Sequence, residues 1–243
     1  MIKGKVDIMG VFIDQGNLDD AANRCKDFLN TDGCKMIITP NTEIIMNAQE
    51  NSKLRQIINT ADLVIPDGIG LIYASKIQKK GLTERVTGVD LMHKILSHCN
   101  ETEKSIYILG GKPGVAKKAC ENIKNKLPGI EVKGFQDGYF KEAEENDIIK
   151  NINELNPDIL FVALGAPKQE IWMGQYREKL NSKMVMGVGG SVDVWAGTVK
   201  RAPEIYQKLG LEWFYRLLKE PWRYKRMMVL PKFMIKVIFS KNI

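Results

Sequence analysis

The chain has 243 residues, of which 44% are hydrophobic and 27% charged, and its formal net charge is +7. It is long enough to bury a core, as one large domain or as a domain with an appendage. Charged residues interrupt the first apolar stretch and no run of about 18 apolar residues follows, so neither a signal peptide nor a membrane-spanning helix is expected.

Apolar runs alternate with amphipathic stretches along most of the chain. We expect strands at 6–13, 35–39, 63–65, 105–109, 131–135, 159–164 and 184–186. We expect helices at 18–30, after 41, at 52–60, 68–80, 87–98, 114–126, 147–155 and 168–180, with Asn41 or Thr42, Ser52 and Thr87 as caps. This alternation predicts an α/β fold with a Rossmann-like, mostly parallel sheet and helices on both faces.

Short polar or glycine-rich motifs follow five of the predicted strands. They are Thr39-Pro40-Asn41-Thr42-Glu43, Pro66-Asp67-Gly68, Gly110-Gly111-Lys112-Pro113-Gly114, Gly165-Ala166-Pro167-Lys168-Gln169-Glu170 and Gly187-Val188-Gly189-Gly190-Ser191-Val192-Asp193. In a parallel sheet the carboxyl ends of the strands share one edge, where such folds bind ligands. The side chains capable of chemistry are therefore expected along one edge of the sheet.

Asp67 is the candidate general base, because a carboxylate in a tight turn after a buried strand can lose solvent and gain a raised pKa. The alternative is an ordinary Asp-Gly turn or a helix cap. Thr39 and Asn41 suit the hydroxyls or amide of a sugar, or they cap the next helix. Arg85 matches phosphate oxygens, with a surface ion pair as the alternative.

The glycine-rich turns at Gly111 and Gly189 favour a diphosphate at a helix N-terminus, although neither matches a dinucleotide or P-loop fingerprint. Asp193 can bind a base or ribose, or cap a helix. Gln169 can hold a sugar or phosphate, whereas Glu170 is expected only to complement the helix dipole.

Metal and histidine chemistry have little support in the sequence. The four cysteines form no CxxC pair and read as free cytosolic thiols, and His93 and His98 lie outside the strand-end motifs. The chain has no Asp-x-Asp, the pair with which many nucleotide-sugar enzymes hold a divalent metal. We therefore expect no metal and no cofactor, so that basic side chains and helix N-termini would neutralise a leaving group.

The last part of the chain differs in charge from the rest. Residues 196–243 hold 11 Lys and Arg against three Asp and Glu, whereas residues 1–195 hold 25 against 26. We expect an α/β catalytic domain over 1–195 and a helical, basic appendage over 196–243. From Tyr224 onward, apolar residues alternate with lysines and arginines, which indicates a helix at a membrane surface or, alternatively, a core-packing helix with a solvated basic face.

Together these motifs resemble the TagA/WecG/CpsF family of bacterial glycosyltransferases over about residues 6–228. The segments Arg85-Val86-Thr87-Gly88, Arg201-Ala202-Pro203 and Glu212-Trp213-Phe214-Tyr215-Arg216 add to the resemblance. The TagA branch is the most similar. It implies an inverting, metal-independent transfer of N-acetylmannosamine from its UDP donor to the 4-hydroxyl of N-acetylglucosamine on undecaprenyl diphosphate, which begins the linkage unit of wall teichoic acid.

The resemblance also implies roles for individual residues. Asp67 would deprotonate the acceptor, Arg85 would stabilise the departing diphosphate, and Gly111 would belong to the substrate-binding set. Thr39, Asn41 and Gln169 would position sugars, and Tyr139 and Asp193 would lie at the uracil. Arg216, Arg223 and Arg226 would bind the diphosphate of the lipid acceptor. The enzyme would be cytoplasmic and peripheral, docking its basic tail on the anionic inner face of the plasma membrane.

Other functions stay open at this point. Within the family, the donor can instead carry N-acetylmannosaminuronic acid or glucose, for another surface polysaccharide. A nucleotide-dependent oxidoreductase lacks its fingerprint here, and a nucleic-acid-binding module is at odds with the slightly acidic sheet region, so no nucleic-acid partner is expected. Self-association that hides the apolar tail in solution is a further expectation.

Overall fold

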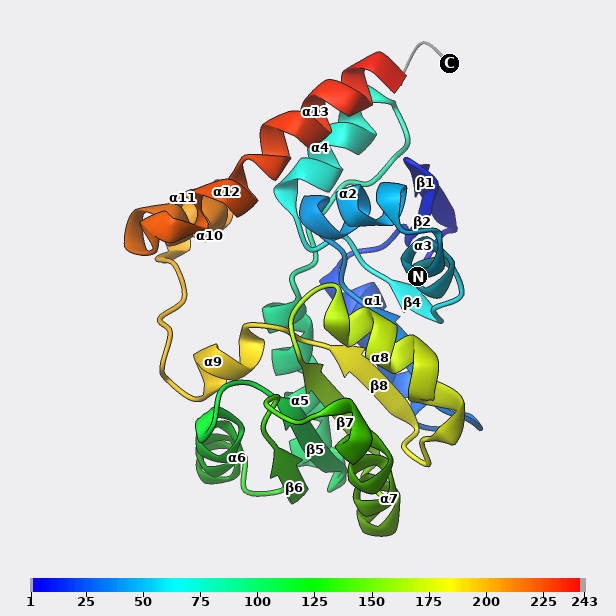
Figure 1. Cartoon of the computed structure of the whole chain (residues 1–243), viewed down its shortest axis with the longest axis vertical. Coiled ribbons are helices and arrows are strands. Elements are labelled where there is room, and N and C mark those ends of the chain that lie inside the picture. Colours follow the sequence, from blue (N-terminus) through cyan, green and yellow to red (C-terminus); the bar gives the residue numbers. More distant parts are fainter. Residues whose placement is uncertain (1, 241–243) are drawn as a thin grey trace.

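The computed structural model describes residues 2–240, apart from the side chains of Arg223 and Lys225. Its centre is a six-stranded sheet in the order β4-β3-β8-β7-β5-β6, and every neighbouring pair in it is parallel. The strands are β3 (Lys35–Ile38), β4 (Leu63–Val64), β5 (Ser105–Gly110), β6 (Glu131–Gln136), β7 (Ile159–Ala163) and β8 (Met184–Gly187). The predicted α/β fold with a parallel sheet is confirmed (Figure 1).

Helices cover both faces of this sheet. One face packs against α1 (Leu18–Phe28), α5 (Gly88–Thr102), α6 (Val115–Lys126) and the short α9 (Ser191–Trp195). The other packs against α2 (Thr42–Glu50), α3 (Ser52–Asn59), α4 (Ile69–Ile77), α7 (Glu145–Leu155) and α8 (Lys168–Tyr176). Successive strand residues serve opposite faces: Ile37 lies in the first cluster, and Met36 and Ile38 lie in the second. The central strands are therefore apolar on both sides.

The first predicted strand, 6–13, is wrong as a single strand of the main sheet. It is a hairpin of β1 (Lys5–Ile8) and β2 (Val11–Asp14), which form a separate antiparallel sheet. Met9 and Gly10 turn the chain with φ angles of 56° and 78°, as a two-residue hairpin turn requires. Apolar alternation continues through this turn, so periodicity alone does not reveal it.

Side-chain caps start several of the helices. Asn41 accepts a hydrogen bond from the Ile44 N–H at the start of α2, and Thr87 caps α5 through the Asp90 N–H, both as predicted. Ser52 was the wrong cap for α3, because Asn51 accepts from the Leu54 N–H and Ser52 is already helical.

The tail of the molecule consists of helices that return to the sheet region. An extended stretch after α9 leads to α10 (Glu204–Lys208) and α11 (Glu212–Lys219), which are followed by a 3-10 turn (Pro221–Arg223), α12 (Tyr224–Met227) and α13 (Val229–Ser240). Figure 1 shows α13 lying along α4 and α2.

Helix α13 packs against the core, as one of the two alternatives from the sequence predicts, and its place at a membrane surface stays a prediction. Phe233 and Val237 are fully buried in the core cluster that contains α2 and α4. The exposed face carries Ile235 and Phe239 beside Lys232 and Lys236. The helix is therefore anchored through one face, while apolar and basic side chains share the other.

Candidate active site

The five predicted motifs lie at one edge of the sheet, because all six strands run in the same direction. In the order of the strands, this edge carries Asp67 after β4, Thr39 and Asn41 after β3, the Gly187–Gly190 turn after β8, Gln169 after β7 and Gly111 after β5. Neighbouring strands are about 4.8 Å apart, so β4 and β5 are separated by roughly 19 Å. The candidate residues thus form a row with two distinguishable ends.

A pocket of about 200 Å³ lies at the β4–β3 end, between the sheet and the tail. The sheet side contributes Asn41, Glu43, Asp67, Arg85 and Thr87, and the tail contributes Glu212, Trp213, Arg216, Arg226 and Leu230. Of the residues predicted from sequence, the pocket brings together Asn41, Asp67, Arg85, Arg216 and Arg226. Residues from both ends of the chain therefore line one site.

Asp67 has the electrostatic character of a general base. Burial raises the pKa of its carboxyl from 3.8 to about 7, although the nearby charges of Arg216 and Arg85 and the N–H of Gly88 act in the opposite direction. A side chain at Gly88 would place its Cβ 3.3 Å from Thr39 Oγ1 and 3.7 Å from Asp67 Oδ2. The absence of a side chain at Gly88 therefore leaves room beside both the Thr39 hydroxyl and the Asp67 carboxyl.

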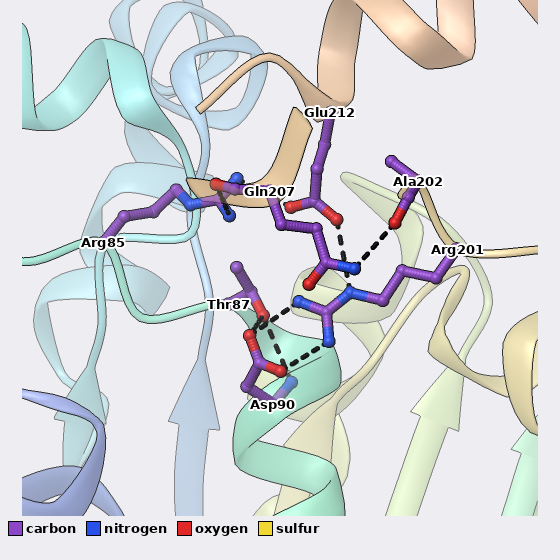
Figure 2. A network of polar contacts seen from close by, with 7 residues as sticks. All are labelled: Arg85, Thr87, Asp90, Arg201, Ala202, Gln207 and Glu212. Atoms are coloured by element: carbon purple, nitrogen blue, oxygen red, sulfur yellow. Dashed lines mark hydrogen bonds and ion pairs between the residues drawn. The ribbon is translucent and has the colours of Figure 1, made fainter. Parts of the chain in front are cut away.

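Arg85 is held by a network of ion pairs that joins the tail to the sheet region (Figure 2). Its Nη1 lies 2.7 Å from Oε2 of Glu212, whose Oε1 accepts from Nε of Arg201 at 3.3 Å. Arg201 also makes two bonds to the Asp90 carboxylate, of 2.5 and 2.7 Å, and Thr87 donates to that carboxylate at 2.6 Å. These contacts hold the guanidinium of Arg85 in place at the pocket.

Arg85 thus forms an ion pair, as the alternative expected, but not one at the surface, and its phosphate role stays a prediction. The Arg85 and Glu212 side chains are only 16% and 13% exposed, so their pair is largely shielded from solvent. Sequence reasoning found Arg85 but missed Glu212 and Arg201 as its supports. Residues more than a hundred positions apart offered no local signal of this contact.

The predicted arginines of the tail have different positions. Arg216 lines the pocket, and its charge opposes the rise in the pKa of Asp67. Arg226 also lines the pocket and makes two short bonds to Glu43, from Nη2 to Oε2 at 2.7 Å and from Nε to Oε1 at 3.0 Å. The side chain of Arg223 lies outside the described residues.

Thr39 and Gln169 lie next along the edge and do not line this pocket. Thr39 Oγ1 donates to the Gly187 carbonyl at 3.4 Å, and Gln169 Oε1 accepts from the Gly189 N–H at 3.2 Å. Thr39 and Gln169 are thus joined through the turn after β8. Glu170 is completely buried and accepts a hydrogen bond from Gln169, and burial raises the pKa of its carboxyl to about 7. Nothing in the sequence indicated these properties.

The remaining predicted residues lie away from the pocket. Gly111 has a φ angle of 77° and links two loops, donating to the Ala163 carbonyl and accepting from the Gly138 N–H, each at 2.9 Å. Tyr139 is 71% exposed beside these loops. Asp193 lies in the first turn of α9. At this β5–β6 end of the edge, the turn after β5 is joined to Ala163 and Gly138, and Tyr139 is exposed.

The described residues form neither a metal-binding cluster nor a membrane-spanning helix. Within residues 2–240, no three His, Cys, Asp or Glu side chains come together as a metal-binding group. No helix in this part of the chain is long and apolar enough to cross a bilayer. Two of the arginines at the pocket, Arg85 and Arg226, are paired with the carboxylates of Glu212 and Glu43.

The chain is similar to known proteins over most of its length. The chain matches the glycosyl transferase WecG/TagA/CpsF family over residues 6–242. It is 37% identical to a Bacillus spizizenii protein over 211 residues, covering 87% of this chain and 81% of the relative. It is 34% identical to a Staphylococcus aureus (strain MRSA252) protein over 240 residues, covering 98% and 94%.

Both relatives are named N-acetylglucosaminyldiphosphoundecaprenol N-acetyl-beta-D-mannosaminyltransferase. A Bacillus subtilis (strain 168) protein with the same name is 37% identical over 203 residues, which is 84% of this chain and 78% of the relative. The match spans the sheet, the pocket and the tail. The chain therefore belongs to the WecG/TagA/CpsF family of glycosyl transferases.

Proposed function

We propose that this enzyme transfers N-acetylmannosamine from UDP-N-acetylmannosamine to the 4-hydroxyl of N-acetylglucosamine on undecaprenyl diphosphate, in the linkage unit of wall teichoic acid. The names of the relatives supply the sugar and the lipid acceptor. The observation that carries the chemistry is Asp67, whose pKa is raised to about 7 in a pocket that Arg85, Arg216 and Arg226 also line. A base beside several cations suits the transfer of a sugar away from a diphosphate.

In the proposed reaction, the Asp67 carboxylate takes the proton of the acceptor hydroxyl. The oxygen forms a bond to the anomeric carbon while the bond from that carbon to the UDP oxygen breaks. Attack opposite the leaving group inverts the anomeric centre. The fixed guanidinium of Arg85 stabilises the negative charge that develops on the departing diphosphate, so we propose that the reaction needs no metal.

The tail is proposed to bring this site to the lipid acceptor. Arg216 and Arg226 line the wall opposite the sheet, where they would bind the diphosphate of the acceptor. Exposed apolar side chains gather on the tail, among them Trp222, Tyr224 and Phe239 with exposed fractions of 72%, 55% and 71%. Together with Lys232 and Lys236, they suit the anionic cytoplasmic face of a membrane, where each Lys or Arg contributes about 1 kcal/mol.

The test is a panel of donors offered with lipid-diphosphate N-acetylglucosamine, with and without a chelator. We expect transfer from UDP-N-acetylmannosamine, undiminished by the chelator and weak or absent with UDP-glucose and UDP-N-acetylmannosaminuronate. Efficient use of either alternative sugar would overturn the proposed donor but not the reaction class. No transfer from any UDP-sugar, or turnover that requires NAD, would overturn the proposal as a whole.

A further inference from the structure

Gln169 and Glu170 form a buried polar pair at the start of α8. Their side chains are 4% and 0% exposed. The Gln169 Nε2 donates to Oε1 of Glu170 at 2.8 Å, and the Gln169 Oε1 accepts from the Gly189 N–H at 3.2 Å. Both ends of the amide are therefore engaged by protein groups of defined hydrogen-bonding character.

These two partners allow a single orientation of the amide. A backbone N–H can only donate, so the Gly189 N–H requires the amide oxygen, and the amide nitrogen is then turned toward the Glu170 carboxyl, to which it donates. A flipped amide would set two donors against each other at Gly189. What the amide retains for a ligand is its second N–H and the second lone pair of its oxygen.

The amide nitrogen also has a defined place at the edge of the sheet. A Cβ at Gly187 would lie 2.9 Å from Gln169 Nε2, and the carbonyl of the same glycine accepts from Thr39. The nitrogen thus lies against the carboxyl end of β8, next to the strand that carries Thr39 and Asn41. This places an amide donor in the middle of the row of candidate residues.

The buried carboxyl of Glu170 lowers the stability of the fold. Its Oε2 has no hydrogen-bond partner among the described residues. A buried carboxyl with an unmade hydrogen bond is destabilising, and an apolar side chain of the same size would avoid that cost. Chains retain such locally unfavourable groups mainly at functional sites.

We propose that Glu170 is a positioning residue, which fixes the Gln169 amide so that its second N–H is offered to an acceptor group on the donor sugar or its phosphates. The inference rests on the proposed function, because it assigns Gln169 to the UDP-sugar. It restricts the contacted group to one that accepts a hydrogen bond. Glu170 itself does not touch the substrate.

The first test compares Glu170→Met with Glu170→Gln. Methionine fills the space but removes the acceptor, so we expect the KM for the UDP-sugar to rise about tenfold, with the KM for the lipid acceptor unchanged and thermal stability equal or higher. Glutamine still offers an oxygen to Gln169, so we expect it to restore the KM for the donor to within about threefold of the wild type. Glu178→Gln, on an 83% exposed side chain, is the matched control.

A donor KM within about twofold of the wild type in Glu170→Met would overturn the proposal. So would a uniform loss of activity and stability in both variants, since that pattern belongs to a purely structural role. If Glu170→Met does not fold, the exchange Gln169→Glu with Glu170→Gln decides. It keeps the buried bond and the bond from Gly189, but it offers the ligand a carboxylate that only accepts.

We expect the exchanged protein to fold and to lose donor binding about tenfold or more. Full activity of the exchanged protein would overturn the role of an oriented amide donor. Wild-type transfer in the same assays separates the two proposals: if the wild type transfers no sugar, the proposed function fails. If the wild type transfers sugar but Glu170→Met keeps its donor KM, only the role of Glu170 fails.

Discussion

The two ends of the sheet edge that carries the candidate residues are built differently. At the β4–β3 end, Asp67 and Arg85 face a wall supplied by α11, α12 and α13, so that the pocket is closed by residues from the far end of the chain. At the β5–β6 end, Gly111 is hydrogen-bonded to Ala163 and Gly138, and Tyr139 is 71% exposed. The first end is closed by the tail, whereas the second is formed by residues of the sheet region alone.

We propose that the two ends have different roles. The closed end holds Asp67, the proposed base, and the arginines, where exclusion of water strengthens electrostatic interactions. The β5–β6 end has positive-φ glycines at 110, 111 and 114 before α6, a conformation that lets backbone approach a diphosphate. A donor lying along the edge would place its sugar at the closed end and its nucleotide at the β5–β6 end. The following experiments act on one end at a time.

The largest effect is expected for Asp67→Asn at the closed end. Turnover should fall about 10²- to 10⁴-fold, because the amide cannot take the proton of the acceptor. Thermal stability should be unchanged or higher, since the amide removes a charge that burial disfavours. Steady-state kinetics, thermal unfolding and UDP binding measure these outcomes, with the exposed Asp147→Asn as the control. Near-normal turnover would remove Asp67 as the base.

The pH dependence sharpens the same assignment. Only the ionised Asp67 acts as a base, so kcat/KM should rise about tenfold per pH unit below about 7 and level off above it. Because the folded pKa exceeds the ordinary value of 3.8, the contribution of this group to stability is full below about 4 and is lost as the pH rises through about 7. The pKa of the Glu170 carboxyl is also raised to about 7, so Glu170→Gln is the control, and it should keep the rise of kcat/KM with pH. Loss of that rise in Glu170→Gln would contradict its assignment to Asp67.

A moderate effect is expected for Arg226→Ala on the tail wall. Removing a charge-assisted contact to the diphosphate of the acceptor should raise the KM for that acceptor roughly tenfold while leaving UDP binding unchanged. Lys232→Ala is the control, since Lys232 is exposed on α13 and does not line the pocket. Equal effects of the two variants, measured on lipid acceptor in vesicles, would indicate a general role in membrane docking instead.

The smallest effect is expected for Tyr139→Ala at the β5–β6 end. Loss of an aromatic contact to the uracil should raise the KM for the donor about two- to tenfold. The KM for the lipid acceptor should not change. Phe12→Ala provides an exposed aromatic control on the separate hairpin, where Phe12 is 44% exposed. Unchanged donor kinetics in Tyr139→Ala would place the uracil of the donor elsewhere along the edge.

Removing the whole tail is a poor test of these roles. Phe233 and Val237 of α13 are buried in the core cluster that includes α2 and α4, so a chain ending at Trp195 would uncover that surface. Loss of large core side chains typically costs several kcal/mol. The division into a domain at 1–195 and an appendage at 196–243 stays a prediction, and point substitutions in the tail test its role more cleanly.

The sequence by itself determined the parallel sheet, the helix caps at Asn41 and Thr87 and the row of candidate residues. These features depend on local patterns: an apolar run, a polar turn and a capped helix, repeated in one direction, place Thr39, Asp67 and Gln169 at one edge. Only the tertiary structure decided that Arg85 pairs with Glu212, that Arg226 pairs with Glu43 and that Glu170 is buried. Such contacts join residues far apart in the chain or depend on how whole helices pack, and no local pattern of residues encodes either.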